Sequence, residues 1–136
     1  MRHFFLLPLL LCCVVVVHLP AAEFDINGRW HARTMGTVFF HFFKDGTVSI
    51  LADEGLKEPY QVKTTYTVEE GDQDSVLYLT IDIPVKYKKG DKVAIRIKVG
   101  ILGPHTIAFQ GAEDIYGSGR REEISRRHDI VMTRVQ

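Results

Sequence analysis

Residues 93–99 read Val-Ala-Ile-Arg-Ile-Lys-Val, in which Val and Ile alternate with Ala, Arg and Lys. Because successive side chains of a strand point to opposite faces, a period of two predicts a strand with one buried face, as in antiparallel sheets. The same alternation recurs in residues 62–68 and 77–83. Branched and aromatic residues, which fit a pleated surface, dominate all three runs. The chain is therefore predicted to be all-β.

Turn residues separate these runs at short intervals. The strongest turn is Asp45-Gly46, since Asp and Gly tolerate the positive φ of tight hairpins. Eight strands are expected, with one helical turn at 122–127 before the last of them: 28–34, 37–43, 46–52, 60–69, 75–83, 92–102, 105–111 and 128–135. An open sheet of hairpins has two unpaired edges, and closure removes both. We therefore predict a single antiparallel up-and-down β-barrel, with a β-sandwich as the alternative.

The N-terminus predicts export. An apolar run from Phe4 to Val17 follows Arg2 and is shorter than the roughly 20 residues that cross a bilayer. Small residues accepted by signal peptidase come after it, so cleavage is expected after Ala21 or Ala22. The prediction is a signal peptide over 1–22, a barrel domain over 23–136, no transmembrane segment in the mature chain, and a periplasmic or extracellular location.

Removal of the predicted signal peptide would change the composition of the chain. Both cysteines, Cys12 and Cys13, lie in the apolar run, so the exported domain contains no thiol and no disulfide. Loss of Arg2 leaves 16 basic and 17 acidic side chains, a net charge of −1. Nucleic acids and anionic membrane surfaces attract an excess of Lys and Arg, so neither is an expected partner. The oligomeric state is left open.

Two ends of the domain carry a family resemblance. Gly28-Arg29-Trp30 stands at the start of the first expected strand, and Arg134 lies on the last. This pairing resembles the calycin superfamily, which includes the lipocalins and their short bacterial lipocalin-like relatives. The resemblance implies that Trp30 closes one end of the barrel and that Arg134 packs across it, a cation over a π face worth about 1 to 2 kcal/mol. Gly28, Trp30 and Arg134 would then be structural.

The resemblance also implies a function. An eight-stranded barrel is filled by side chains or holds one small ligand. We expect a non-enzymatic binding module with a small apolar or amphipathic ligand, since apolar walls with few polar groups suit such cargo. The aromatic residues expected to line the ligand are Phe40, Phe42, Tyr60, Tyr66, Tyr78 and Phe109.

A protein partner is the alternative. Residues 37–43 are apolar on both faces, so if Phe40 and Phe42 point inward, then Phe39 and Phe43 point outward and form a partner surface. Some exported calycin-like barrels inhibit proteases by inserting an N-terminal segment, and residues 23–26 resemble such a tail. Capture of a partner is therefore predicted to use this tail or the aromatic strand.

Metal and catalytic signatures are weak. A three-residue loop after the first strand would place His31 opposite His41 at about 5 Å, the beginning of a zinc site, but spacing supplies no third ligand. The mature chain has no cysteine nucleophile, no Gly-x-Ser-x-Gly elbow and no phosphate-binding loop. No enzyme activity, metal or cofactor is predicted.

Overall fold

The computed structural model describes residues 19–32, 38–52, 60–124 and 129–136. Two 3-10 turns, η1 (Ala21–Glu23) and η3 (Val85–Tyr87), accompany the strands, and no helix in these ranges is long and apolar enough to cross a membrane. The nine strands of this part of the chain are β1 (Gly28–Ala32), β2 (Val38–Phe42), β3 (Thr47–Ala52), β4 (Tyr60–Glu70), β5 (Val76–Asp82), β6 (Lys92–Gly103), β7 (Thr106–Tyr116), β8 (Arg121–Ile124) and β9 (Ile130–Arg134).

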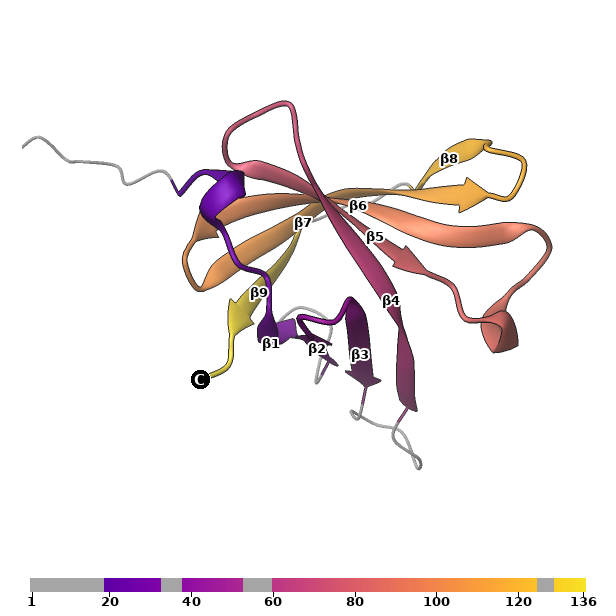
Figure 1. Cartoon of the computed structure of the whole chain (residues 1–136), viewed down its shortest axis with the longest axis horizontal. Helices are drawn as coiled ribbons and strands as arrows, with labels where there is room; N and C mark the ends of the chain where they lie inside the picture. The colour runs from indigo at the N-terminus through magenta and orange to yellow at the C-terminus, as the bar shows by residue number, and fades with distance from the viewer. Residues whose placement is uncertain (1–18, 33–37, 53–59, 125–128) are drawn as a thin grey trace, which may run out of the picture.

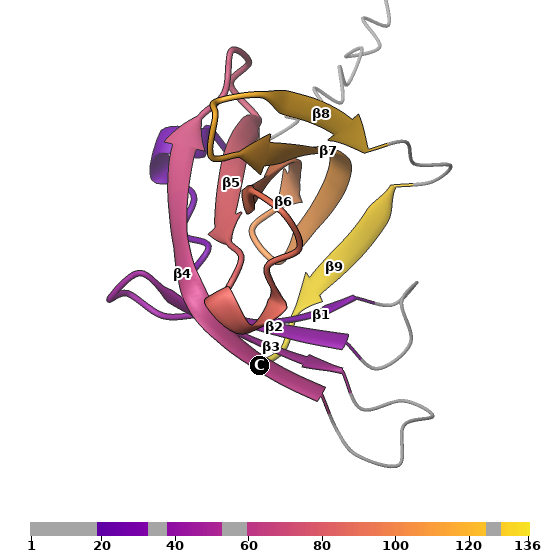
Figure 2. The same ribbon diagram turned by 90° about the vertical axis from the view of Figure 1, so that its right-hand side faces the viewer.

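The strands close into an antiparallel barrel. Eight of them pair in the order β6-β5-β4-β3-β2-β1-β9-β7, and the pairing of β6 with β7 closes the ring. Figure 2 looks into this ring, with β4 on one side, β9 on the other and β1, β2 and β3 below. Closure confirms the predicted up-and-down barrel and rules out the sandwich, because no edge of the eight-stranded sheet is left open.

β4 bends between its pairing with β3 and its pairing with β5. Its residues 60–65 pair with β3, whereas residues 66–70 pair with β5. The strands on the two sides of this bend therefore cross, as Figure 1 shows for β1 to β3 against β5 to β7. The bend is fixed at Tyr66, whose amide donates to the carbonyl of Gly46 at 2.9 Å and whose hydroxyl donates to that of Phe43 at 2.7 Å.

The end of the chain differs from the prediction. The expected helical turn over 122–127 is wrong in its described half, because Glu122 and Glu123 belong to β8. β8 and β9 pair with the same edge of β7. Ile130 of β9 pairs with Phe109, and Ile124 of β8 pairs with Ala112, so three residues along β7 correspond to six residues between these two partners. The other predicted strands agree within two residues at each end except at β7, which continues to Tyr116. A longer β7 pairs with β8 as well as β9, so β8 is an addition to the barrel.

The core follows the alternation. Inward side chains from the barrel strands form one apolar cluster. No polar or charged residue of the described chain is fully buried. Burying each such side chain contributes about 1.5 to 3 kcal/mol, so a thiol-free domain can be held by its core. The largest fully buried side chains are Trp30, Phe42, Val48, Leu77, Leu79, Val99, Ile107 and Met132.

Candidate functional site

One end of the barrel, which we call the floor, is closed by Trp30. Its indole is fully buried and donates from Nε1 to the carbonyl of Ile26 at 2.8 Å. Arg134 lies directly opposite on β9, with its guanidinium carbon 4.3 Å from the Trp30 ring centroid. The predicted contact between these two residues is confirmed.

Arg134 also ties three segments together. Its guanidinium donates to the carbonyls of Asp25, at 2.7 Å, and Asn27, and to that of Pro104 at 3.3 Å. Gly28 has a φ of +118°, and a Cβ at that position would lie 3.0 Å from Nη1 of Arg134. The close approach of the guanidinium to the backbone therefore requires glycine at position 28.

The N-terminal tail is docked onto the floor. Phe24 lies 6.0 Å from Trp30 between ring centroids, and Ile26 is buried in the core. The hydrogen bond from Asn27 N to the carboxylate of Asp25, followed by weaker effects that include the nearby Arg134, holds the pKa of Asp25 below its ordinary value. Residues 24–26 are thus part of the barrel floor, not a free segment.

Three of the aromatic residues predicted to line a ligand fill the interior above the floor. Phe40 contacts Phe109 edge-on at 5.6 Å and Phe42 at 6.1 Å, and all three are buried. Phe42 also meets Tyr66, which is half-buried, at 5.0 Å. Burial, with the charges of Asp25 and Asp45, raises the pKa of Tyr66. These rings pack on one another, so this half of the barrel is a core.

Of the other two predicted lining residues, only Tyr78 has a described side chain, and it does not face the interior. The structure places Tyr78 on the outer wall, because it alternates with the buried Leu77 and Leu79, and Arg96 stacks on its ring at 3.7 Å. Arg96 is paired in turn with Glu113 at 3.4 Å. Tyr60 begins β4, but its side chain lies outside the described residues.

Interior side chains differ in their exposure to solvent. Trp30, Val48, Leu79, Val99, Ile107 and Met132 are inaccessible, whereas the exposed fraction is 6% for Ile97 and Ala112, 8% for Ile81 and Ile101, and 9% for Val62. Beyond these lie four half-buried isoleucines, each paired with an inward residue of a neighbouring strand: Ile50 with Phe40, Ile95 with Ile81, Ile124 with Ala112, and Ile130 with Phe109. We call these four residues the isoleucine rim.

Polar groups stand beside the isoleucine rim on the same wall. Asp114 pairs with Ile95 across the sheet and therefore shares its inner face. Its Oδ2 lies 2.9 Å from the Lys92 ammonium, and its Oδ1 is buried without a hydrogen-bond partner. The hydrogen bond with Asp114 raises the pKa of Lys92. An apolar rim with a buried acceptor next to it is the arrangement that an amphipathic molecule fits.

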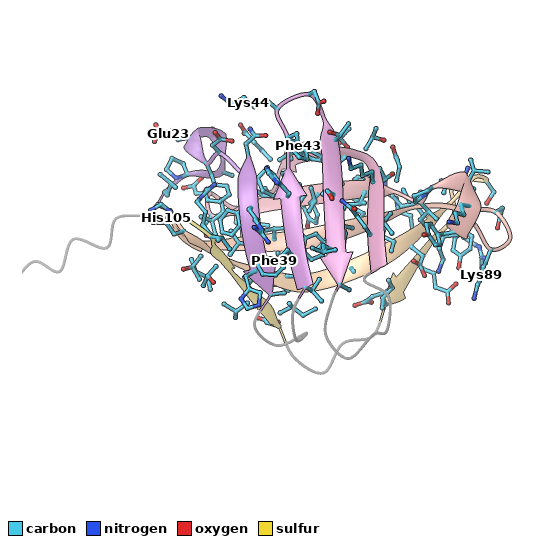
Figure 3. The ribbon with its side chains drawn as sticks, turned by 90° about the horizontal axis from the view of Figure 1, so that it is seen from below. Glu23, Phe39, Phe43, Lys44, Lys89 and His105 are labelled. Carbon is cyan, nitrogen blue, oxygen red and sulfur yellow. The ribbon has the colours of Figure 1, made fainter. Side chains whose placement is uncertain are left out.

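The outer face of β2 carries the predicted partner surface. Phe39 stacks with His31 at 4.9 Å and Phe43 with His41 at 4.0 Å, and Phe43 is 39% exposed. Figure 3 looks onto this face and labels both phenylalanines. The outward orientation predicted for these two side chains is confirmed.

The predicted histidine pair is wrong. Cross-strand pairing sets His31 opposite Phe39 and His41 opposite Arg29, because the pairing of β1 with β2 is centred on residue 35, whereas a His31–His41 pair needs a centre at residue 36. Within the described ranges, no group of three His, Asp or Glu side chains could hold a metal ion. The register also reveals what the sequence did not, namely that Arg29 and His41 are neighbours.

The chain matches no protein-family model, no curated protein and no solved structure.

Proposed function

We propose that the chain is an exported, non-enzymatic binding module that holds a small amphipathic molecule at the end of the barrel opposite Trp30. The observation that carries the proposal is the isoleucine rim, in which four branched apolar side chains on the inner wall remain half-exposed. Leaving such side chains in water is unfavourable by about 25 cal/mol for each Å² of apolar surface. A bound apolar group would cover that surface.

The polar neighbours of the rim define the other half of the ligand. Asp114 Oδ1 is a buried acceptor without a donor, and an unsatisfied buried group is unfavourable by about 1 to 3 kcal/mol. A ligand hydroxyl or ammonium group could supply that donor while the apolar part of the same molecule rests on Ile95 and Ile124. The proposed ligand is therefore an alkyl or aryl chain with a hydrogen-bond donor, not a pure hydrocarbon.

Neighbouring residues of β3 provide a matched test. Ile50 faces the interior and Ser49 faces outward, so Ile50→Trp fills the rim end and Ser49→Trp adds the same ring to the outside. We expect one fluorescent long-chain alcohol to bind per wild-type chain, Ile50→Trp to abolish uptake, and Ser49→Trp to retain it. Circular dichroism and the melting temperature verify that both variants fold. Native mass spectrometry and lipid extraction that find neither co-purifying ligand nor uptake would refute the proposal.

Capture of a protein partner is a second candidate, favoured by the exposed ring of Phe43 on the outer face of the barrel. Because residues 24–26 are docked on the floor, this candidate would use the aromatic strand and not the N-terminal tail. Pull-down from the native compartment tests it. Phe39→Ser with Phe43→Ser should abolish capture, whereas Ile50→Trp should leave it unchanged.

A further inference from the structure

The outer wall formed by β1 to β4 carries two cross-strand rows of side chains. One row, which we call the polar row, runs from Arg29 through His41 and Ser49 to Lys63, each paired with the next across the sheet. The second, the apolar row, runs from His31 through Phe39 to Leu51. The rows are separated by two residues along each strand, which is about 6.8 Å.

The charged side chains on the described strands of this wall are all basic. The described strands β1, β2, β3 and β9 and the first six residues of β4 contain no Asp or Glu. Arg29 and Lys63, with two histidines between them, therefore share the described part of this wall with no carboxylate, on a mature domain whose predicted net charge is −1. Concentration of cationic groups on one wall of an otherwise acidic domain favours an anionic ligand there.

The Arg29 side chain is oriented by a ring contact and is not paired with a described carboxylate. Its guanidinium carbon lies 4.2 Å from the Phe39 ring centroid, and among the described residues the guanidinium has no ion-pair or hydrogen-bond partner. Stacking fixes the plane of the guanidinium, so its donors are oriented before a ligand arrives. His41 stands directly opposite on β2, and its ring is held by Phe43. Two oriented nitrogen-bearing groups thus lie side by side at one end of the polar row.

A hollow opens between the two rows. It has a volume of about 250 Å³ and is lined by Arg29, Phe39, His41, Ser49, Leu51 and Gln61. On the β4 side it is bounded by the hydrogen bond from Gln61 to Ser49, at 3.1 Å. Drug-sized ligands occupy about 300 to 1,000 Å³, so this hollow suits a smaller molecule with a single ring. Its lining is cationic along one edge and apolar along the other.

We infer that this hollow is a second binding site, distinct from the barrel interior, for a small organic carboxylate with a flat apolar body. The carboxylate lies against Arg29 and His41, since a planar guanidinium donates two parallel hydrogen bonds to a carboxylate. The apolar body rests on Phe39 and Leu51. Because the Arg29 guanidinium carbon lies 4.2 Å from the Phe39 ring centroid, the two parts are joined by a short link, such as the two-carbon link between an aryl ring and its acid.

Phenylpropionate is a probe of this size, and phenylpropanol is its neutral counterpart. Titrated into the full mature chain and followed by amide NMR shifts, phenylpropionate should bind saturably, with shifts at Arg29, Phe39 and His41. Phenylpropanol should bind about tenfold more weakly, because it cannot form the charge-assisted pair. Arg29→Gln should remove this preference for the acid. Lys98→Gln, which deletes an exposed cation on a different wall, is the matched control and should leave binding unchanged.

The tryptophan pair separates this site from the barrel interior. Ser49→Trp fills the hollow and should abolish phenylpropionate binding, while Ile50→Trp should preserve it, the reverse of the result expected for the rim ligand. Equal affinity for the acid and the alcohol, shifts at Ile95 and Ile124 instead of Arg29, or retained binding in Arg29→Gln would overturn the inference. An acidic peptide that binds this face when phenylpropionate does not would also overturn it, in favour of a protein partner.

Discussion

Arg134 and Trp30 lie opposite each other on neighbouring strands, and the guanidinium of the first caps the ring of the second at 4.3 Å. The same guanidinium forms no ion pair with a carboxylate of the described residues. It is instead satisfied by the carbonyls of Asp25, Asn27 and Pro104, which belong to the N-terminal tail and the β6–β7 hairpin. One side chain on the last strand therefore joins the segment before β1 and the β6–β7 hairpin to the barrel floor.

Replacing Arg134 should loosen that floor. Arg134→Gln loses the cation over the ring and most of the fork of donors, so we expect the free energy of unfolding to fall by about 2 kcal/mol. Arg134→Lys keeps the charge but not the planar fork and should be intermediate. Urea denaturation measures both, and Trp30 is the only tryptophan, so its fluorescence reports on the floor directly. Arg121→Gln, at an exposed ion pair, should change stability by less than about 0.5 kcal/mol.

Gly28 gives a second test of the same contact. Gly28→Ala places a Cβ 3.0 Å from Arg134 Nη1 on a backbone with a φ of +118°, so we expect a loss of about 2 kcal/mol. Gly111→Ala is the matched control, since its Cβ would meet no heavy atom within 4 Å and its φ is not in the left-handed region. Equal melting temperatures for the two variants would contradict the role assigned to Gly28.

The barrel could be predicted because its strands carry a period of two, whereas the pairing of β1 with β2 could not. Their register depends on where the connection between them is centred, and a shift of that centre from residue 36 to residue 35 moves His31 from His41 to Phe39. A change of two residues in pairing leaves each side chain on its own face. Phe39 and Phe43 were therefore correctly predicted to point outward, although the neighbours of Arg29 were not.

Other features depend on tertiary context. Arg121, Glu122 and Glu123 have no apolar alternation, and β8 exists because the exposed edge of β7 offers it backbone partners. The alternation in residues 77–83 already indicated that Tyr78 faces away from Leu77 and Leu79, and an aromatic side chain is not enough to place it inside. The partial exposure of the isoleucine rim could not be foreseen either, because alternation predicts which face a side chain takes and not how deeply it is buried.

Acid should weaken the floor through Asp25. Its carboxylate accepts from the backbone and side chain of Asn27, which lowers its folded pKa below the ordinary 3.8. A lowered folded pKa stabilises the protein above the unfolded pKa, and this stabilisation is lost as the pH falls through the folded value. Asp25→Asn should therefore flatten the fall in melting temperature below pH 4. Asp72→Asn, in an exposed turn, should retain the wild-type slope.

Ile26 tests whether the tail belongs to the fold. It is 5% exposed and belongs to the core cluster, and its carbonyl accepts from Trp30 Nε1. Ile26→Ala creates a cavity beneath the indole and should lower the free energy of unfolding by about 2 to 4 kcal/mol, whereas Val85→Ala at an 82% exposed site should change it by less than about 0.5 kcal/mol.

Ile26 packs against Trp30 and is not one of the four residues of the isoleucine rim, so Ile26→Ala should alter stability without altering ligand uptake below its melting temperature. Uptake of the fluorescent alcohol by the folded variant, compared with its urea midpoint, separates the two effects. A variant that keeps its stability would show that residues 24–26 detach freely, and the tail would then become available to a protein partner. Loss of stability with retained uptake is the expected result, because Trp30 donates to the Ile26 carbonyl and Arg134 to the Asp25 carbonyl, so both hold residues 24–26 on the floor.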